Sequence, residues 1–381
     1  MNFEISKKEL SSLTTLVHRA ASHIASRNNI PTLAGILIEL EQGKGLTITA
    51  TDLEIGLKAS TQAVDVITPG KFLVNANLFS DFIKLLPDTD IQLELDPEKN
   101  KLKVSYGRSF GYINLYAAEE YPELPIQDIK NTLKISQNTL RNALKKTVFA
   151  AANQHFRQIF TGVLFDVTES GELHVVASDT HRLAYYRCRV LGEDNKAVTF
   201  IVPVRAVNEL LRVMEDSEEL ITIGVSDNNV VFSNDRILLF SRMIDGQYPN
   251  YENVIPSELT TETTIPSGVI VSALERARTM PPDDKFKIPM IKLGFTPNEI
   301  NIVTVSEKMG EIKEFIDGIE VTGNQDFTIA FNTNYFLDIA KLLAAENDTI
   351  RFRLSGAFGA AIIDNPEKEE FLYVLVPLRG N

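Results

Sequence analysis

Three stretches decide the fold: NANLFSDFIKLL (residues 75–86), PVRAVNELLRVM (residues 203–214) and NTNYFLDIAKLL (residues 332–343). Their first residues are 128 and 129 residues apart, and each stretch places apolar residues at the spacing of an amphipathic helix. An alternating strand pattern follows each of them, namely IQLEL, LITIGV and TIRFRL. The chain therefore contains three copies of one unit.

A second set of segments repeats with a similar period. ISKKELSSLTTLV starts at Ile5, ISQNTLRNALKKTV at Ile135 and IPSGVIVSALERAR at Ile265, so these starts are 130 residues apart both times. Each segment follows a short strand-like stretch and is typical of a helix, with Ser136 as the expected N-cap of the second. Each unit thus has two similar halves, each with a helix and several strands.

The fold class predicted from this pattern is α+β, with three similar domains. Most strands alternate polar and apolar residues, which is typical of antiparallel sheets covered on one face by helices. Proline-bearing stretches, EEYPELPIQD and GQYPNYENVIPSEL, interrupt the periodic pattern between the units. We therefore expect domains at residues 1–127, 128–256 and 257–381, each with two helices packed on antiparallel sheets.

Composition narrows the class of protein. Of the 381 residues, 44% are hydrophobic and 23% charged, as in an ordinary globular protein. The single cysteine, Cys188, excludes an internal disulfide framework and a cysteine-rich metal site. The sequence has no apolar run of about 18 residues, and its first residues carry charges where a signal peptide needs an apolar core. We expect a soluble, cytoplasmic protein.

Positive charge gathers in the predicted helical regions. The chain has a net charge of −13, yet these regions hold fourteen basic and five acidic residues, so they sum to +9 and the remainder to −22. The regions counted are residues 5–27, 75–86, 135–157, 203–214, 265–280 and 332–343. A positive helix surface repeated in all three units indicates contact with a phosphate backbone, although surface helices also carry Lys and Arg without such a role. The sequence contains no motif that reads bases.

Signals for catalysis are weak. His18 and His23 lie five residues apart and lack the spacing of a metal-binding helix, and no phosphate-binding loop or nucleophile elbow is present. Ser178, Asp179 and His181 have the residue types of a catalytic triad, but triads are rarely assembled from adjacent positions. We expect no metal and no cofactor. The apolar ending FLYVLVPLRGN either completes a strand or lines a groove for a partner's short apolar motif, and both can hold together.

Over its whole length the chain resembles the bacterial DNA polymerase III beta subunits, the DNA sliding clamps. The resemblance rests on RNNIPTLAGIL, TATDLEIGL, AANQHFRQIFTGVLFDV, ASDTHRLA, DGQYPNYENVIP, FNTNYFLDIAKLL and YVLVPLR, in this order and spacing. It implies a head-to-tail homodimer whose six domains close a ring around duplex DNA, with helices lining the hole. It also implies a non-catalytic processivity factor that an ATP-driven loader opens. Its partners would be the replicative polymerase, the clamp loader and other clamp-motif proteins of replication and repair.

The same resemblance implies three sets of site residues. A groove for partner peptides would be formed by Phe160, Ser178, Thr180, His181, Arg182, Leu183, Pro249, Val254, Phe286, Asn332, Tyr335, Phe358, Ala360, Val374, Leu375, Val376, Pro377, Leu378 and Arg379. DNA-facing positions would be Arg27, Arg108, Gln154 and Arg205. Apolar candidates for the subunit interface would be Ile113 and Met280.

Several positions depart from the commoner family pattern. Thr180 stands where glycine is frequent, Asn253 where arginine can occur, and Val376 and Leu378 where methionines are common. Gly111 occupies a place where a bulky aromatic can sit, and Phe110 or Tyr112 could compensate. Two other functions stay open from the residues alone: a peptide-binding scaffold that never encircles DNA, and a hydrolase that uses His181 and Asp179.

Overall fold

The computed structural model describes residues 1–22, 31–96, 98–126, 128–192, 196–282 and 287–379. The chain forms two compact units, each treated below by itself. The first comprises Met1–Arg141, Leu191–Asp194 and Arg205–Met243, and the second comprises Asn142–Val190, Asn195–Val204 and Ile244–Asn381. The middle repeat therefore contributes to both units.

The helices confirm the repeat. The part of the chain that the structure describes has six α-helices: α1 (Lys7–Ser22), α2 (Ala76–Leu85), α3 (Gln137–Thr147), α4 (Val204–Val213), α5 (Ser267–Arg278) and α6 (Thr333–Ala344). Ser136 is the N-cap of α3, as predicted, since its Oγ accepts from the backbone N of Thr139 at 3.1 Å. Two further helices have side-chain caps: Asn75 caps α2 by accepting from the backbone N of Leu78, and Asn332 caps α6 by accepting from the backbone N of Asn334.

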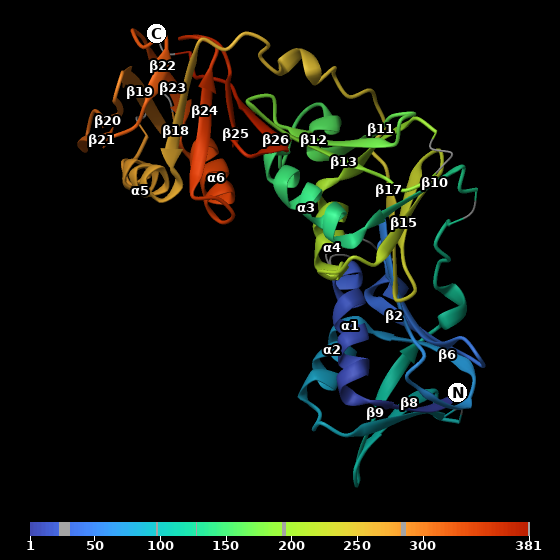
Figure 1. The fold of residues 1–381 in the computed structure, drawn as a ribbon. Helices are drawn as coiled ribbons and strands as arrows, with labels where there is room; N and C mark the ends of the chain where they lie inside the picture. Colours follow the sequence, from blue (N-terminus) through green and yellow to red (C-terminus); the bar gives the residue numbers. More distant parts are fainter. Residues whose placement is uncertain (23–30, 97, 127, 193–195, 283–286, 380–381) are drawn as a thin grey trace. The chain divides into compact units, whose positions relative to one another are not determined.

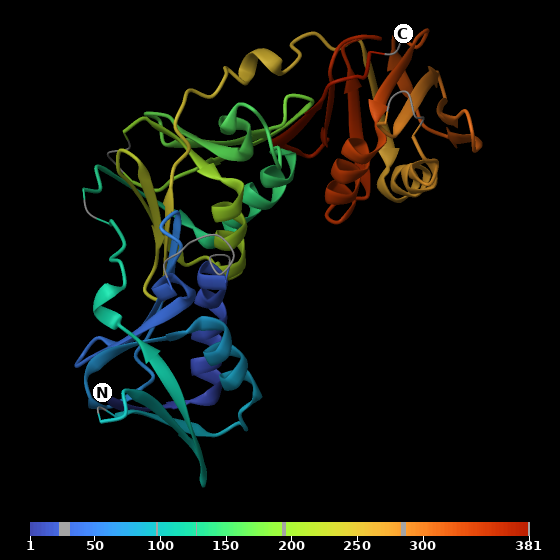
Figure 2. The ribbon, with the colours of Figure 1, turned by 180° about the vertical axis from the view of Figure 1, so that it is seen from behind.

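The first unit is built on one antiparallel sheet, and its thirteen described strands run in the order β10-β15-β16-β17-β4-β3-β2-β6-β9-β8-β7-β1-β5. In that order they are Asn131–Ser136, Leu220–Val225, Asn229–Ser233, Ile237–Arg242, Ile55–Thr61, Gly45–Thr51, Gly35–Glu41, Gly70–Asn75, Ser109–Tyr116, Lys101–Tyr106, Asp90–Asp96, Asn2–Ser6 and Asp65–Thr68. Helices α1 and α2 lie side by side (Figures 1 and 2) and pack on strands of this sheet. Strand β17 of the middle repeat pairs with β4 of the first, so the sheet continues from one repeat into the next.

The second unit has two sheets within its described residues. Nine strands run in the order β14-β11-β12-β13-β26-β25-β24-β18-β22. They are Val198–Pro203, Gly162–Val167, Glu172–Ser178, Arg182–Arg189, Lys368–Leu375, Ala361–Asn365, Thr349–Leu354, Thr261–Pro266 and Val321–Gly323. The smaller sheet, β21-β20-β19-β23, consists of Gly310–Asp317, Glu299–Ser306, Met290–Thr296 and Thr328–Asn332. Helices α5 and α6 pack together beside these strands (Figure 1).

One predicted helical region is too long. Helix α3 ends at Thr147, and only the short 3-10 helix η3 (Val148–Ala150) continues it. Residues 151–157 form no helix, so Gln154 and Arg157 lie in a loop and not on a helix face. The predicted region 5–27 extends past Ser22 into residues outside the described range. No described helix is both long enough and apolar enough to cross a bilayer.

Candidate functional site

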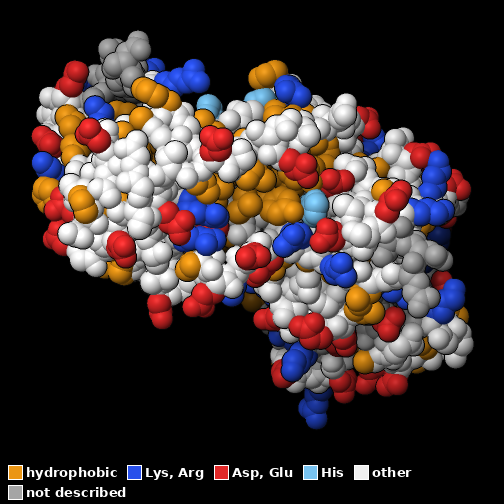
Figure 3. Space-filling view, turned by 45° about the horizontal axis from the view of Figure 1, so that its top comes forward, with side chains coloured by type: hydrophobic (Ala, Val, Ile, Leu, Met, Phe, Trp, Pro, Cys, Tyr) orange, Lys and Arg blue, Asp and Glu red, His pale blue; other side chains and the backbone are white. Residues whose placement is uncertain are grey.

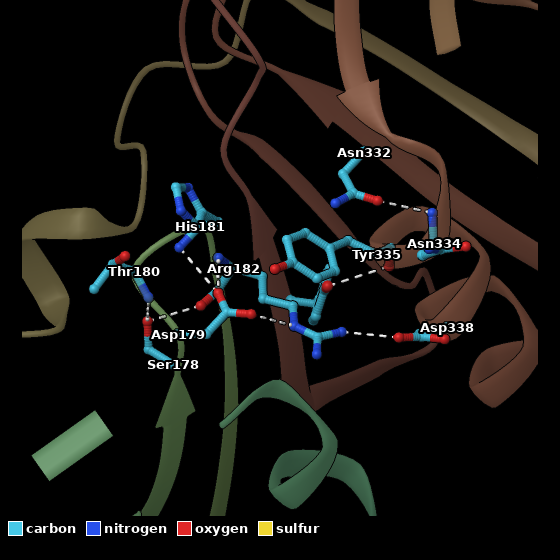
Figure 4. Close-up of polar contacts among 10 residues, drawn as sticks. Ser178, Asp179, Thr180, His181, Arg182, Asn332, Asn334, Tyr335 and Asp338 are labelled. Carbon is cyan, nitrogen blue, oxygen red and sulfur yellow. Dashed lines mark hydrogen bonds and ion pairs between the residues drawn. The ribbon is translucent and has the colours of Figure 1, made fainter. Parts of the chain in front are cut away.

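The loop between β12 and β13 is fixed by its own side chains. Oδ1 of Asp179 accepts from the backbone N of His181 and of Arg182, both at 3.0 Å. Oγ of Ser178 donates to the carbonyl of Arg182 at 2.7 Å and accepts from the backbone N of Thr180 at 3.1 Å. Thr180 has a φ of 76°, the left-handed conformation that glycine adopts without strain. Figure 4 shows these contacts.

Arg182 connects this loop to α6. Its Nε donates to Oδ2 of Asp179 and its Nη1 to Oδ2 of Asp338, both at 2.9 Å. The guanidinium also lies 4.2 Å from the ring centroid of Tyr335 and 5.7 Å from that of Phe149. Burial alone would lower the pKa of Arg182, but the surrounding groups raise it overall. The loop, η3 and α6 are thus held together by one charged side chain that is only 10% exposed.

Apolar side chains form a cluster next to this loop, hereafter the groove cluster. Its buried members are Ile159, Phe160, Leu164, Val176, Leu183, Ile201, Tyr251 and Val374. Partly buried side chains pack against them, among them Tyr248, Ile255 and Ala360. Hydrophobic side chains also gather in the middle of the face drawn in Figure 3, with His and charged side chains of both signs around them. An apolar wall beside a rigid polar loop can bind a short apolar segment of another chain.

The structure brings together many of the groove residues expected from the sequence. Strand β26 pairs with β13 so that Leu183 lies opposite Val374, and the backbone N of Val376 donates to the carbonyl of His181 at 2.9 Å. The expected residues divide by exposure into three groups. Thr180, His181, Val254, Phe358 and Arg379 are exposed; Arg182, Pro249, Asn332, Tyr335, Ala360, Val376 and Leu378 are half-buried; and Phe160, Ser178, Leu183, Val374, Leu375 and Pro377 are buried. Phe286 lies outside the described residues.

The geometry does not support the hydrolase alternative. The hydroxyl of Ser178 is engaged by the backbone of its own loop, and the carboxylate of Asp179 by two backbone N–H groups and Arg182. Among the described contacts, no hydrogen bond joins the His181 ring to either of them. A general base must lie within hydrogen-bond reach of its nucleophile, and this loop instead uses its polar groups to hold its shape. The described residues also include no cluster of three metal-ligating side chains.

The observed helices remain net positive. They hold twelve basic and five acidic residues. Several of these cations are paired: Lys146 with Glu346, Arg205 with Asp52, Arg212 with Glu209, Arg276 with Glu314 and Lys341 with Glu275. Lys8, Lys84, Lys145 and Arg278 are exposed. These exposed cations are available to phosphates, so the excess of positive charge persists after ion pairing.

The expected DNA-facing residues lie in different surroundings. Arg205 lies on α4, half-buried and paired with Asp52. Arg108 is exposed in the tight turn between β8 and β9, and Gln154 is exposed in the loop after η3. Arg27 lies outside the described residues. Only Arg205 of the three described residues is on a helix.

The two expected interface residues also differ in exposure. Ile113 on β9 is 7% exposed and faces the core of its own unit, whereas its neighbours Phe110 and Tyr112 are 59% and 42% exposed. Met280, just after α5, is half-buried. Exposed aromatic side chains therefore lie on β9 on either side of Gly111.

Asp338, Phe149 and Tyr251 also belong to this site, although no pattern in the sequence marked them. The signal for Asp179 as a loop anchor was present, because TATDLEIGL and ASDTHRLA place an aspartate at equivalent positions. Asp338 and Phe149 approach Arg182 only through tertiary contacts.

Comparison with known proteins gives one consistent answer. Models of the DNA polymerase III beta subunit match three segments: the N-terminal domain at residues 1–125, the central domain at 134–250 and the C-terminal domain at 252–379. The chain is 30% identical to the beta sliding clamp of Haemophilus influenzae over 380 residues, covering 100% of both. It is 29% identical to that of Bacillus subtilis over 387 residues, again covering 100% of both.

Solved structures agree in fold over the full length. The DNA polymerase sliding clamp of Bacillus subtilis is 28% identical with a TM-score of 0.91, covering 100% of both chains. The Pseudomonas aeruginosa sliding clamp bound to griselimycin is 26% identical with a TM-score of 0.91 and the same coverage. Three repeats of helices on antiparallel sheets, a net positive set of helices and these full-length similarities lead to one conclusion: the chain belongs to the bacterial DNA polymerase III beta subunits, the beta sliding clamps.

Proposed function

We propose that two copies of this chain close into a ring that encircles duplex DNA and slides along it. As a sliding clamp the chain is a non-catalytic processivity subunit, and DNA synthesis belongs to the polymerase it holds. Each copy would contribute three domains, at residues 1–127, 128–256 and 257–381. A tether of this kind raises the effective concentration of the polymerase at the primer end, so that each dissociation is followed by rapid rebinding.

One observation carries this proposal: the helices of all three repeats are net positive in a chain whose total charge is −13. Phosphate contacts without base reading give binding that is independent of sequence, which a sliding protein needs. Exposed cations such as Lys145 and Arg278 supply a loose hold, and closure of the ring supplies retention.

We infer that ring closure joins β9 of one copy to β21 of the next. Strand β21 is the last strand of its sheet, and β9 pairs with β6 only at Leu73–Tyr116 and Val74–Leu115. Both strands therefore offer free backbone groups to a new partner. Phe110 and Tyr112 on β9 and Phe315 on β21 are exposed for apolar contact. In this arrangement Ile113 supports β9 from within, and Met280 lies on the same domain as β21.

We further propose that the groove cluster and the loop at residues 178–182 bind short linear motifs. The replicative polymerase, the clamp loader and other clamp-motif replication and repair proteins would share this site. The charged contacts of Arg182 keep the loop in place, so a peptide meets a preformed surface and loses little free energy in ordering it. Val376 and Leu378 border this surface through backbone bonds to His181 and Ala330.

Retention on DNA tests enclosure. The clamp is loaded onto nicked circular DNA, and the circle is then cut at one site. A closed ring stays on the circle through gel filtration at raised salt and leaves the linear product by sliding off its ends. Equal retention on both forms overturns topological binding and favours a peptide-binding scaffold that does not encircle DNA.

Truncation tests the groove separately. Deleting residues 376–381 removes the backbone bonds at Val376 and Leu378 but keeps Leu375, which is fully buried in β26. We expect loss of binding to a clamp-motif peptide with retained dimerisation and retention on circular DNA. Unchanged peptide affinity contradicts the groove assignment and leaves the ring proposal intact.

A further inference from the structure

Two sheet faces of this chain, one in the first repeat and one in the middle repeat, have the same strand register. In the first repeat, Glu39 on β2 lies opposite Thr47 on β3 and Lys71 on β6. In the middle repeat, the equivalent Asp166 on β11 lies opposite His174 on β12 and Thr199 on β14. Thr49 pairs with Lys58 in the same way that Val176 pairs with Tyr185. The two faces can therefore be compared position by position.

The face of the middle repeat is filled by the ring of Tyr251. Its hydroxyl donates to Oδ2 of Asp166 at 3.0 Å, and Nδ1 of His174 lies 2.8 Å from the hydroxyl oxygen of Tyr251. The Tyr185 ring lies 5.9 Å from that of Tyr251, centroid to centroid. Burial and the nearby Asp166 raise the pKa of Tyr251 above its usual range, so the phenol stays protonated and donates. This face therefore already binds a phenol group, which is the side chain of Tyr251.

The equivalent face of the first repeat is open. Leu124 stands where the middle repeat has Tyr251, as the shared YP dipeptides at residues 121–122 and 248–249 establish. A cavity of about 440 Å³ remains there, and its lining includes Leu37, Glu39, Thr49, Lys58, Lys71 and Leu124. A leucine reaches less far than a tyrosine, so the carboxylate of Glu39 has no phenol above it.

An orphaned polar group lines the same cavity. Thr49 is 3% exposed, and its Oγ1 has no hydrogen-bond partner. A buried hydroxyl without a partner is destabilising, and the middle repeat places an apolar Val176 at this position. Lys71 lies opposite Glu39 on β6, and Lys58 lies opposite Thr49 on β4, so donors and an acceptor line the cavity together with Leu37 and Leu124. This combination is typical of a site for a small polar-tipped ligand.

We propose that this cavity binds a phenol group, with the ring on Leu37 and Leu124 and the phenol proton directed to Glu39. The chain's own Tyr251 on Asp166 is the template for this interaction. Two sources of the group are possible, the tyrosine side chain of a protein partner and a free phenolic molecule. The site lies on the strand layer of the first unit and shares no residue with the groove cluster.

The first test compares 4-methylphenol, the tyrosine side-chain analogue, with toluene, which lacks the hydroxyl. Binding to the intact protein is followed by NMR of labelled Leu and Thr methyl groups. We expect saturable shifts at Leu37, Thr49 and Leu124, with toluene binding roughly fivefold more weakly because it lacks one hydrogen bond. Equal binding of the two compounds, or shifts confined to other residues, overturns the proposal.

Two variants sharpen the test. Leu124→Tyr places a phenol ring of the chain itself in the cavity, so it should abolish 4-methylphenol binding. Glu39→Ala removes the proposed acceptor of the phenol proton, so it should weaken 4-methylphenol several-fold while leaving toluene unchanged. If the Glu39→Ala protein binds both compounds as the parent does, and Leu124→Tyr folds without blocking either, no phenol site exists.

A third probe separates the two sources of the phenol. N-acetyltyrosinamide carries the same ring with the peptide groups of a tyrosine residue attached. Binding at least as tight as that of 4-methylphenol points to a tyrosine of a protein partner. Binding of 4-methylphenol alone points to a free phenol. Both results support the site, and failure of both probes overturns it.

Discussion

Asp52 and Asp179 anchor two equivalent loops in the same way. Each Oδ1 accepts from the backbone N of the residues two and three positions later, at 3.0 and 2.7 Å for Asp52 and at 3.0 Å twice for Asp179. Their cationic partners differ, because Asp52 pairs with Arg205 of α4 and Asp179 with Arg182 of its own loop. The two repeats thus share the loop structure, but the arginine that pairs with the aspartate comes from a different element in each repeat.

The Asp179–Arg182 pair should matter more for stability than the Arg182–Asp338 pair. Asp179→Ala leaves a buried guanidinium and two backbone N–H groups without their acceptor, since both side chains are about 10% exposed. We expect a loss of about 3 kcal/mol in the free energy of unfolding, measured by urea denaturation. Asp338→Asn is the matched control. Asp338 is 51% exposed, so its loss should cost less than about 1 kcal/mol. Equal effects would refute this ranking.

Thr180 stores backbone strain that glycine would release. Its φ of 76° is unfavourable for a residue with a Cβ. We expect Thr180→Gly to stabilise the protein by roughly 0.5–1 kcal/mol, the relief of strain exceeding the added entropy of the unfolded chain. Thr180→Ala serves as the control, because it keeps the Cβ and should leave thermal stability nearly unchanged. A destabilised Thr180→Gly protein would contradict the argument.

Lys145 should contribute more to DNA binding than Arg205. Lys145 is exposed on α3, whereas the charge of Arg205 is compensated by Asp52. We expect Lys145→Ala to lower the salt dependence of binding to linear duplex by about one unit in the slope of log K against log salt. Arg205→Ala should change this slope less and instead reduce thermal stability, since it leaves the buried Asp52 unpaired. The reverse order would exclude Lys145 as a phosphate contact.

The Lys146–Glu346 pair should give a small acid-dependent part of the stability. Burial alone would raise the pKa of Glu346, but the hydrogen bond and charge of Lys146 at 2.8 Å, with Lys368, lower it overall. Because the folded-state pKa lies below that of the unfolded chain, the stabilisation is present above about pH 4.3 and disappears as the pH falls through the folded-state pKa.

The comparison is with Lys146→Met, which removes the cation and keeps the length of the side chain. The parent should lose up to about 1 kcal/mol relative to this variant as the pH is lowered, since Glu346 is 41% exposed and screened by solvent. Identical pH profiles of unfolding for the two proteins would show that the pair contributes nothing.

The sequence by itself determined the repeat, the fold class and the positive sign of the net charge on the helices. Apolar spacing at residues 75–86, 203–214 and 332–343 is a local property, and it predicted α2, α4 and α6 and the strands that follow them. It also placed the cap at Ser136. The helical region around α3 was predicted too long, because apolar residues continue after Thr147 in η3, which leaves the helix and contacts β12 and β13.

Only the tertiary structure decided which partners the polar groups find. Arg182 meets Asp338 across 156 positions of the chain, and Tyr251 meets Asp166 across 85. Strand pairing and helix packing bring such residues together, and no local pattern encodes those distances. The cavity could not be predicted for the same reason. Tyr251 fills the sheet face of the middle repeat, whereas Leu124 at the equivalent position of the first repeat leaves a cavity. The strands that surround this cavity come together only in the folded chain.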